Sequence, residues 1–342
     1  MKKNRITTII KRTFLVLLGT LFMLLLTIIG AVYIVLCGPS KSAQELFARS
    51  LKETSAIGFI VDIFLPEERV EEIIGSKEII VETADMDTSL ISISATKKET
   101  SAENTEDAGD TGNMENGIEF VEITGASYRG ILMIVQDPTR IFVGTPDSFG
   151  GRGLTLAKMI EKYDAIGGIN GGGFDDPNGT GTGGTPSGIV ITDGTLAWGS
   201  ADTMSTVIGF DAEGILHVGY MSGRTALDSG LQWACSFGPA LIVNGEPLSN
   251  GSIPASGVNP RTAIGQRADG AVLLLVVDGR QVTSLGATYE DLIGIMLEHG
   301  AVNAANLDGG SSSEMIYNGE ALNINASVKG ARPLPTTFLV KK

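Results

Sequence analysis

The sequence predicts a mixed α+β protein, in which a strand-rich domain with few helices follows one transmembrane helix and a helical or disordered stalk. Three observations lead to this prediction. Residues 13–36 carry no charge, residues 96–117 contain almost no large apolar side chain, and short apolar runs of strand length recur from Ile118 onward. The chain has 342 residues, which is more than one compact domain usually needs, and its 45 glycines follow no collagen-like period.

The first 36 residues predict a membrane anchor. Residues 1–12 form a basic tail, and the uncharged run at 13–36 is 24 residues long. About 20 apolar residues cross a bilayer core of roughly 30 Å, whereas a cleaved signal peptide has an apolar region of only about 7–15. The run ends without the small residues of a cleavage site. We therefore expect a single-pass signal-anchor protein of the cell membrane, with a cytoplasmic N-terminus and an extracellular C-terminal domain.

The charge argues against nucleic-acid binding, and the two cysteines argue against a disulfide. The formal charge is −14, and without the five basic residues of the tail it is −19, so the body would be repelled by nucleic acid. The two cysteines, Cys37 and Cys235, lie far apart in the sequence, and we expect no disulfide between them. Cys235 is expected to be a small buried side chain.

Residues 37–117 are predicted to form a juxtamembrane helical neck followed by a flexible linker. Ser42 to Glu45 has the pattern of a capping box, and Pro66 is expected to begin an acidic helix that extends through Ile74. The polar composition of residues 96–117 cannot bury enough surface to form a core. Self-association of the neck is compatible with this pattern, and no catalytic residue is expected in it.

Residues 118–342 are predicted to form one domain. Its expected strands are Ile118–Ile123, Ile131–Val135, Gly188–Ile191, Thr206–Phe210, Leu216–Tyr220, Arg261–Gly265, Val272–Val277 and Ala301–Leu307. Its expected helices are Leu154–Tyr163 and Tyr289–His299, the second with Thr288 and Asp291 as a cap. Because strands outnumber helices and do not alternate with them, we expect an α+β arrangement rather than βαβ units.

Polar segments at the ends of these strands contain the candidate site. They are rich in carboxylates, amides and glycines, and the residues with the most chemistry are Asn170, Asp175, Asp176, Arg261, Asp278, Asn306 and Asp308. Paired acids with amides suit glycosidic cleavage, and arginine suits a phosphate or carboxylate. Three consecutive glycines at 171–173 are typical of backbone that approaches a ligand closely, while Asp278-Gly279 is equally typical of a turn.

Other chemistries lack their motifs. No phosphate-binding G-x-x-x-x-G-K-[ST] occurs, and no dinucleotide-binding glycine pattern opens a helix after a strand. The serines at 311–313 are not in a G-x-S-x-G sequence, and only His217 and His299 could act as a base. Nucleotide binding and serine hydrolysis are therefore not favoured.

Three segments together resemble the phosphodiester glycosidase family, whose bacterial members are often labelled exopolysaccharide biosynthesis proteins. They are Gly168-Ile-Asn-Gly-Gly-Gly-Phe174, Asn259-Pro-Arg-Thr-Ala-Ile-Gly265 and Leu307-Asp-Gly-Gly-Ser-Ser312, within a resemblance that covers about residues 118–340. The resemblance implies hydrolysis of a sugar-1-phosphodiester at the anomeric carbon, here in envelope or exopolysaccharide glycopolymers. It matches Asn170 and Phe174, Arg261, and Asp308 to the family's motifs. Glu314 departs from the pattern and is interpreted as a solvated strand residue.

We assign a role to each candidate residue. Asp308 is the preferred base or stabilising carboxylate, with Asp278 as the second candidate, and Arg261 would hold the phosphate. The expected substrate contacts come from Asn170, Gly171, Gly172, Gly173, Phe174, Asn306, Gly309, Gly310 and Ser311. The expected partners are a glycan phosphodiester and the membrane, and no cofactor is required. The alternatives are a non-catalytic glycopolymer-binding module and a metal-dependent phosphodiesterase, with a divalent cation held by Asp175, Asp176 and Asp308.

Overall fold

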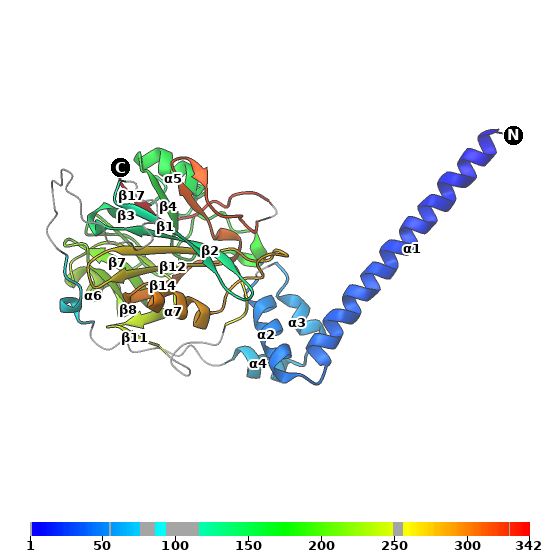
Figure 1. Ribbon diagram of the computed structural model, residues 1–342, viewed down its shortest axis with the longest axis horizontal. Helices are drawn as coiled ribbons and strands as arrows, with labels where there is room; N and C mark the ends of the chain where they lie inside the picture. Colours follow the sequence, from blue (N-terminus) through cyan, green and yellow to red (C-terminus); the bar gives the residue numbers. More distant parts are fainter. Residues whose placement is uncertain (1, 55, 76–85, 94–115, 249–255, 328) are drawn as a thin grey trace, which may run out of the picture.

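The computed structural model describes residues 2–54, 56–75, 86–93, 116–248, 256–327 and 329–342. One long helix projects from a strand-rich body, and three short helices lie between the two (Figure 1). Apart from its last two residues, the predicted linker at 96–117 lies outside the described part of the chain.

The projecting helix is α1 (Lys2–Cys37), which by length and composition alone could cross a membrane. The neck that follows consists of α2 (Lys41–Lys52), α3 (Phe59–Phe64) and α4 (Glu67–Ile74). As predicted, α4 follows Pro66. The predicted capping box at Ser42 is wrong. The cap is Ser40, whose hydroxyl accepts a hydrogen bond from the N–H of Ala43, and α2 begins at Lys41.

The largest sheet has seven strands, all antiparallel, in the order β1-β2-β13-β12-β14-β10-β11. Its strands are β1 (Ile118–Thr124), β2 (Arg129–Val135), β10 (Ala240–Val243), β11 (Glu246–Pro247), β12 (Arg261–Arg267), β13 (Val272–Val277) and β14 (Ala301–Leu307).

Two five-stranded sheets pack with it. The first, in the order β16-β15-β4-β17-β3, consists of β3 (Ile141–Gly144), β4 (Gly167–Asn170), β15 (Met315–Tyr317), β16 (Glu320–Ala321) and β17 (Thr337–Val340). The second, in the order β6-β5-β9-β7-β8, consists of β5 (Val190–Thr192), β6 (Thr195–Trp198), β7 (Met204–Asp211), β8 (Leu216–Ser222) and β9 (Leu231–Ser236).

Three helices of the body, α5 (Leu156–Tyr163), α6 (Gly223–Asp228) and α7 (Tyr289–Glu298), each begin after a hydroxyl side chain that accepts a backbone hydrogen bond. Thr288 and Asp291 form the predicted capping box of α7. Short 3-10 turns lie at Thr88–Leu90, Pro138–Arg140, Pro177–Gly179 and Gly310–Ser312.

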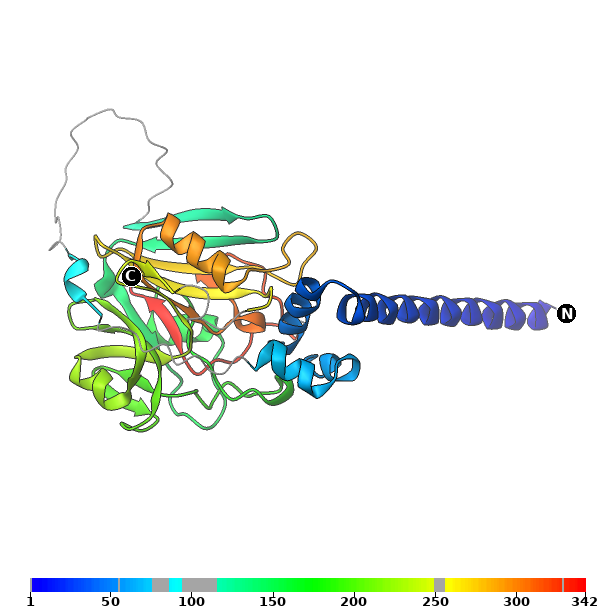
Figure 2. The same cartoon turned by 90° about the horizontal axis from the view of Figure 1, so that it is seen from below.

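The large sheet is buried on both faces, which explains the uninterrupted apolar run of β13. Leu273 and Leu275 pack in the cluster beneath α7, whereas Leu274 and Val276 pack in a second cluster that includes residues of the two smaller sheets. Figure 2 shows α7 lying along one face of the large sheet. A strand buried on both faces needs apolar side chains at every position.

The predicted fold class is confirmed, since the body is a strand-rich α+β domain preceded by an apolar helix. The two cysteines are free, and Cys235 is buried. Burial raises the pKa of its thiol to about 12, as expected for a small buried side chain without a redox role.

Candidate active site

Three adjacent strands bring the predicted charged residues to one edge of the large sheet. Arg261, the first residue of β12, pairs with Val277 at the end of β13, and Thr262 pairs with Leu307 at the end of β14. Because β12 is antiparallel to both neighbours, Asp278 and Asp308 follow their strands at the edge where Arg261 begins its own. The sequence-based grouping of Arg261, Asp278 and Asp308 therefore agrees with the strand register.

Asp308 lies in surroundings suited to a base. Its carboxyl group is crowded by protein atoms, and this burial raises its pKa to about 6, against the partly opposing effects of the Ser312 hydroxyl, the Arg332 guanidinium and the Gly309 N–H. The residue as a whole keeps part of its surface exposed. A carboxylate with a pKa near 6 is ionised at neutral pH but accepts a proton more readily than an ordinary aspartate.

Asn170 fixes the backbone on both sides of this region. Its side-chain amide donates to the carbonyl of Asp308, and its Oδ1 accepts from Thr262 Oγ1 at 2.8 Å and from the N–H of Glu314 at 3.1 Å. The residue is fully buried. The sequence assigned Asn170 to sugar binding, whereas the structure places it beneath the surface as a link between β4 and the segment 308–314.

The three glycines after β4 allow the backbone to approach Thr336 and Ser236 closely. Their N–H groups donate to Thr336 O at 3.1 Å, to Thr336 Oγ1 at 2.9 Å and to Ser236 O at 3.1 Å, in the order Gly171, Gly172, Gly173. A Cβ atom at Gly172 would lie 2.7 Å from Ser236 O, so glycine is required for steric reasons. The sequence predicted that these glycines contact the substrate, but in this structure each of their N–H groups is already bonded within the protein.

Arg332 contacts both Phe174 and Asp176, and its charge acts on Asp308. Its guanidinium forms two hydrogen bonds with the carboxylate of Asp176, at 2.8 and 2.7 Å, and lies 5.0 Å from the centre of the Phe174 ring. The hydrogen bond to Asp176 raises the pKa of Arg332, so its positive charge is permanent. No sequence motif pointed to Arg332, which lies outside the regular elements, between β16 and β17.

The metal alternative is not supported by this arrangement of carboxylates. Among the described residues, no group of three or more His, Cys, Asp or Glu side chains could hold a metal ion. The carboxylate of Asp176 is engaged by Arg332 instead.

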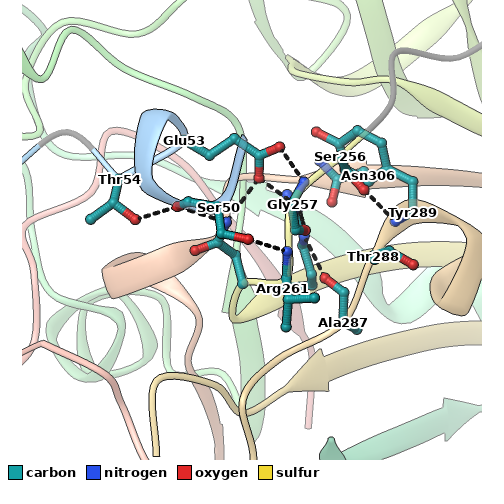
Figure 3. Close-up of polar contacts among 12 residues, drawn as sticks. Ser50, Glu53, Thr54, Ser256, Gly257, Arg261, Ala287, Thr288, Tyr289 and Asn306 are labelled. Carbon is teal, nitrogen blue, oxygen red and sulfur yellow. Dashed lines mark hydrogen bonds and ion pairs between the residues drawn. The ribbon is translucent and has the colours of Figure 1, made fainter. Parts of the chain in front are cut away.

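Arg261 is buried, with only 5% of its surface exposed. Its Nε donates to Ala287 O at 3.1 Å, its Nη2 donates to Gly257 O at 2.7 Å and to Glu53 Oε2 at 2.6 Å, and the guanidinium lies 4.5 Å from the centre of the Tyr289 ring (Figure 3). The sequence predicted that Arg261 grips an anion. In this structure the anion is the carboxylate of Glu53.

Glu53 comes from the neck, where the sequence predicted nothing of chemical interest. The same carboxylate accepts from the Gly257 N–H at 2.8 Å and from Asn259 Nδ2 at 2.9 Å (Figure 3). Ser50 adds a further bond, since its Oγ accepts from the Val258 N–H at 2.8 Å. The end of α2 is therefore docked onto the loop that leads into β12.

A second arginine, Arg280, lies beside Arg261. Its Nη2 donates to Thr54 Oγ1 at 2.9 Å and to Asn259 Oδ1 at 3.1 Å, and its Nη1 donates to Ser311 Oγ at 3.3 Å. Burial, and then the positive charge of Arg261, lower the pKa of Arg280. Arg280 has a φ of 59°, a left-handed conformation that is rare for a long side chain and often marks functional sites.

The glycines of the predicted substrate loop lie next to the two arginines. A Cβ atom at Gly310, whose φ is 60°, would lie 3.2 Å from Arg280 Nη2, and one at Gly309 would lie 2.8 Å from Pro260 O. Gly309, Gly310 and Ser311 are all partly exposed, so this loop remains accessible between Asp308 and Arg280.

Asp278 faces a different environment. Its Oδ1 accepts from Asn323 Nδ2 at 3.2 Å and from the Ile324 N–H at 3.0 Å, which ties it to the loop after β16. Burial raises its pKa, and those hydrogen bonds partly oppose the effect. It borders a shallow cavity of about 210 Å³ that is also lined by Glu122, Thr124 and Arg129.

Two further residues differ from their predicted environments. Asn306 is 1% exposed and its Nδ2 donates to Gly238 O at 2.8 Å, so its side chain is not open to a sugar in this structure. Glu314 was expected to be solvated, and this prediction is wrong, because the residue is 8% exposed and burial raises its pKa. The N–H of Glu314 donates to Asn170, which also bonds the backbone carbonyl of Asp308.

The fold and the strand-end carboxylates define a hydrolase-like site, and comparison with known proteins identifies its class. The family model for phosphodiester glycosidases matches residues 163–341, more than half of the chain. The protein therefore belongs to the phosphodiester glycosidase family. The matched region includes Asn170, Arg261 and Asp308 but begins after β3.

Individual relatives are distant. The chain is 29% identical over 198 residues to the SPbeta prophage-derived uncharacterized protein YomE of Bacillus subtilis, covering 55% of this chain and 29% of YomE. It is 27% identical over 217 residues to N-acetylglucosamine-1-phosphodiester alpha-N-acetylglucosaminidase of Mus musculus, covering 57% of this chain and 41% of that protein. The chain thus spans less than half the length of these two relatives.

A solved structure shares the fold. It is the zebrafish N-acetylglucosamine-1-phosphodiester alpha-N-acetylglucosaminidase catalytic domain, described as auto-inhibited by its pro-peptide, with a TM-score of 0.54 and 23% identity over 66% of this chain and 82% of that one. At this identity the likeness concerns the fold alone.

Proposed function

We propose that the protein is a membrane-anchored hydrolase that cleaves the glycosidic bond of a sugar-1-phosphodiester, with its body outside the cell. Family membership supports the reaction class, and the apolar helix α1 supports the anchor. The observation that carries the proposal is the carboxyl group of Asp308, whose pKa of about 6 suits proton transfer at neutral pH, at a sheet edge that also presents two arginines.

The reaction needs a base and an anion site more than a strong acid. Water attacks the anomeric carbon and gives its proton to Asp308, while the bond from that carbon to the phosphate oxygen breaks and the electron pair leaves with the phosphate monoester. Because a phosphate is a better leaving group than an alkoxide, little help from a general acid is required. Glu314, a buried acid whose pKa is raised by burial, is our candidate for such help.

Arg280 and Arg261 form the proposed phosphate site. Their guanidinium groups are close enough for Arg261 to lower the pKa of Arg280, so a bound anion would relieve their repulsion. Ser311 and the partly exposed glycines beside it link this site to Asp308. Arginine suits this role because its guanidinium can bind two phosphate oxygens at once.

The neck carboxylate occupies one half of this site. Since Glu53 pairs with Arg261, a substrate phosphate can bind that arginine only after Glu53 leaves. The zebrafish relative is described as auto-inhibited by its pro-peptide, and we infer that the neck holds this protein in a comparable low-activity state.

Two neck variants test this part of the proposal. We expect Glu53→Ala to raise kcat/KM severalfold, whereas Glu71→Ala, an exposed position on α4, should leave it unchanged. A fall in kcat/KM of Glu53→Ala at unchanged Tm would contradict inhibition and would show that Glu53 instead helps to build the site.

The reaction itself is tested by identifying the bond that is cleaved. The purified full chain is incubated with a panel of sugar-1-phosphodiesters, with and without a chelator. A glycosidase releases a free reducing sugar and a phosphate monoester, and is indifferent to chelation. Release of sugar-1-phosphate that stops on chelation would indicate a metal-dependent phosphodiesterase. Binding without any cleavage would indicate a glycopolymer-binding module.

A further inference from the structure

The neck carries an apolar surface that no described part of the protein covers. Ile57, Phe59 and Ile63 lie within seven residues of one another and are 39%, 61% and 67% exposed. Phe59 and Ile63 are four residues apart in α3, so they share one side of that helix. We call these three side chains the apolar face of the neck.

The opposite side of α3 packs against the end of α1. Val61 is fully buried in a cluster with Leu36, and Val32 packs against this cluster. The rings of Tyr33 and Phe64 are 6.4 Å apart, and the thiol of Cys37 donates to the carbonyl of Phe64. Figure 1 shows α3 beside the last turns of α1. The apolar face is therefore level with the end of the apolar helix.

The length of α1 places this level at the membrane surface. The uncharged run at 13–36 has 24 residues and is about 36 Å long as a helix, whereas the hydrocarbon core is about 30 Å thick. About one turn of α1 thus exceeds the core. That turn includes Leu36, which is covered by the neck rather than exposed to lipid.

We propose that the apolar face of the neck lies in the interfacial layer of the bilayer that α1 enters, and so holds the active site close to the membrane surface. The inference rests on the proposed anchoring by α1. Of the acidic side chains of α3 and α4, Asp62 pairs with Lys52 and Glu72 with Arg69, while Glu67, Glu68 and Glu71 are exposed to solvent. An aromatic and aliphatic face beside a charged, solvated side is typical of interfacial segments.

This placement narrows the substrate class. The site begins at Glu53, directly after α2, and α2 has 12 residues and is about 18 Å long. Arg261 and Arg280 contact Glu53 and Thr54, so the anion site lies about that distance from the start of the neck, and the neck lies between the body and α1 (Figure 2). A glycosyl phosphodiester attached to a lipid, or to a polymer held at the membrane, would reach it once Glu53 has left Arg261.

Depth-dependent quenching tests the inference on the full chain. The protein is reconstituted into phosphatidylcholine and phosphatidylglycerol vesicles, in one sample with lipids brominated near the headgroup end of the acyl chain and in another with lipids brominated near its methyl end. Phe59→Trp and Ile63→Trp are compared with Leu24→Trp, in the middle of α1, and with Glu68→Trp, an exposed polar position on α4. The emission of Trp198 and Trp233 is subtracted by using the unsubstituted protein.

We expect the tryptophans at 59 and 63 to be quenched strongly and the one at 68 to remain unquenched. If Leu24→Trp is quenched while Phe59→Trp and Ile63→Trp behave like Glu68→Trp, the inference is wrong although the anchor stands. If Leu24→Trp is not quenched in any brominated lipid, both the anchor and the inference fail. Cross-linking of an Ile63→Cys variant in a Cys37→Ser background to a second copy would assign the face to self-association and would also overturn the inference.

Discussion

Asp278 follows β13 and Asp308 follows β14 at the same edge of the large sheet, yet their surroundings differ. Asp278 accepts hydrogen bonds from Asn323 and from the backbone of Ile324, so its carboxylate fastens the loop after β16. Asp308 is followed by a partly exposed glycine-rich loop, whose Ser311 accepts a hydrogen bond from Arg280, and the charge of Arg332 acts on the carboxyl group of Asp308. Position at a strand end is therefore insufficient to define a catalytic carboxylate, and the segment that covers it decides its role.

The sharpest test of this difference is Asp308→Asn. We expect kcat to fall by about a thousandfold or more, since the amide cannot accept the proton of the attacking water. Substrate affinity should change little. Because an ionised carboxylate is disfavoured at this buried position, Tm at pH 8 should stay the same or rise. Wild-type turnover in a well-folded variant would remove Asp308 from the mechanism.

Asn170→Ala tests how Asp308 is held. The change leaves the buried Thr262 hydroxyl and the Glu314 N–H without their acceptor, and we expect a loss of about 2–4 kcal/mol in the free energy of unfolding. Urea denaturation measures this loss. Asn323→Ala, which removes a hydrogen bond to the carboxylate of Asp278 and contacts to Met315 and Ser313, is the comparison variant at a partly buried position and should cost less. Equal losses would show that the backbone at Asp308 is held no more firmly than the loop that contacts Asp278.

The pH dependence of kcat/KM should report the raised pKa of Asp308. Because the base must be ionised, activity is expected to rise with pH and level off above about 6, falling roughly tenfold per unit below it. The stability of the protein should change in the opposite direction. The pKa of Asp308 is about 6 in the folded protein and 3.8 in the unfolded chain, so the free energy of unfolding falls as the pH rises from 3.8 to about 6. Activity that falls through pH 6 would make Asp308 the acid.

The smallest expected effect belongs to Asp278→Asn. We expect kcat to stay within about threefold of the wild type, because the carboxylate is engaged in holding the loop. The weaker hydrogen bonds to Asn323 and Ile324 lower stability while removal of the buried charge raises it, so the free energy of unfolding at pH 8 should stay within about 1 kcal/mol of the wild type. A loss in kcat comparable with that of Asp308→Asn, at unchanged Tm, would transfer the role of base to Asp278.

The end of β13 could be predicted because this strand is an uninterrupted apolar run followed by Asp278, whereas β12 and β14 mix apolar with polar residues and are bordered by polar segments at the site. Shorter strands escaped prediction. β4 reads Gly-Gly-Ile-Asn, and β15 and β16 have three and two residues. Their identity depends on neighbouring strands and not on local pattern.

The partners of the site residues could not be predicted for a related reason. Glu53 meets Arg261 across 208 positions of the chain, and Arg332 meets Asp176 across 156. Polarity alone also misled the interpretation of Asn170 and Asn306, because an amide can satisfy backbone groups inside the protein as well as a sugar outside it.

The contact between the neck and the body requires glycine at position 257. A Cβ atom at Gly257 would lie 2.3 Å from the backbone nitrogen of Ser50, so any other residue there would push α2 off the body. A lineage that acquired a side chain at this position would lose the docked neck in a single step, and with it the carboxylate that now sits on Arg261. The residue that aligns with Gly257 in a relative therefore indicates, from that one position of its sequence, whether the relative can carry its neck in the same place.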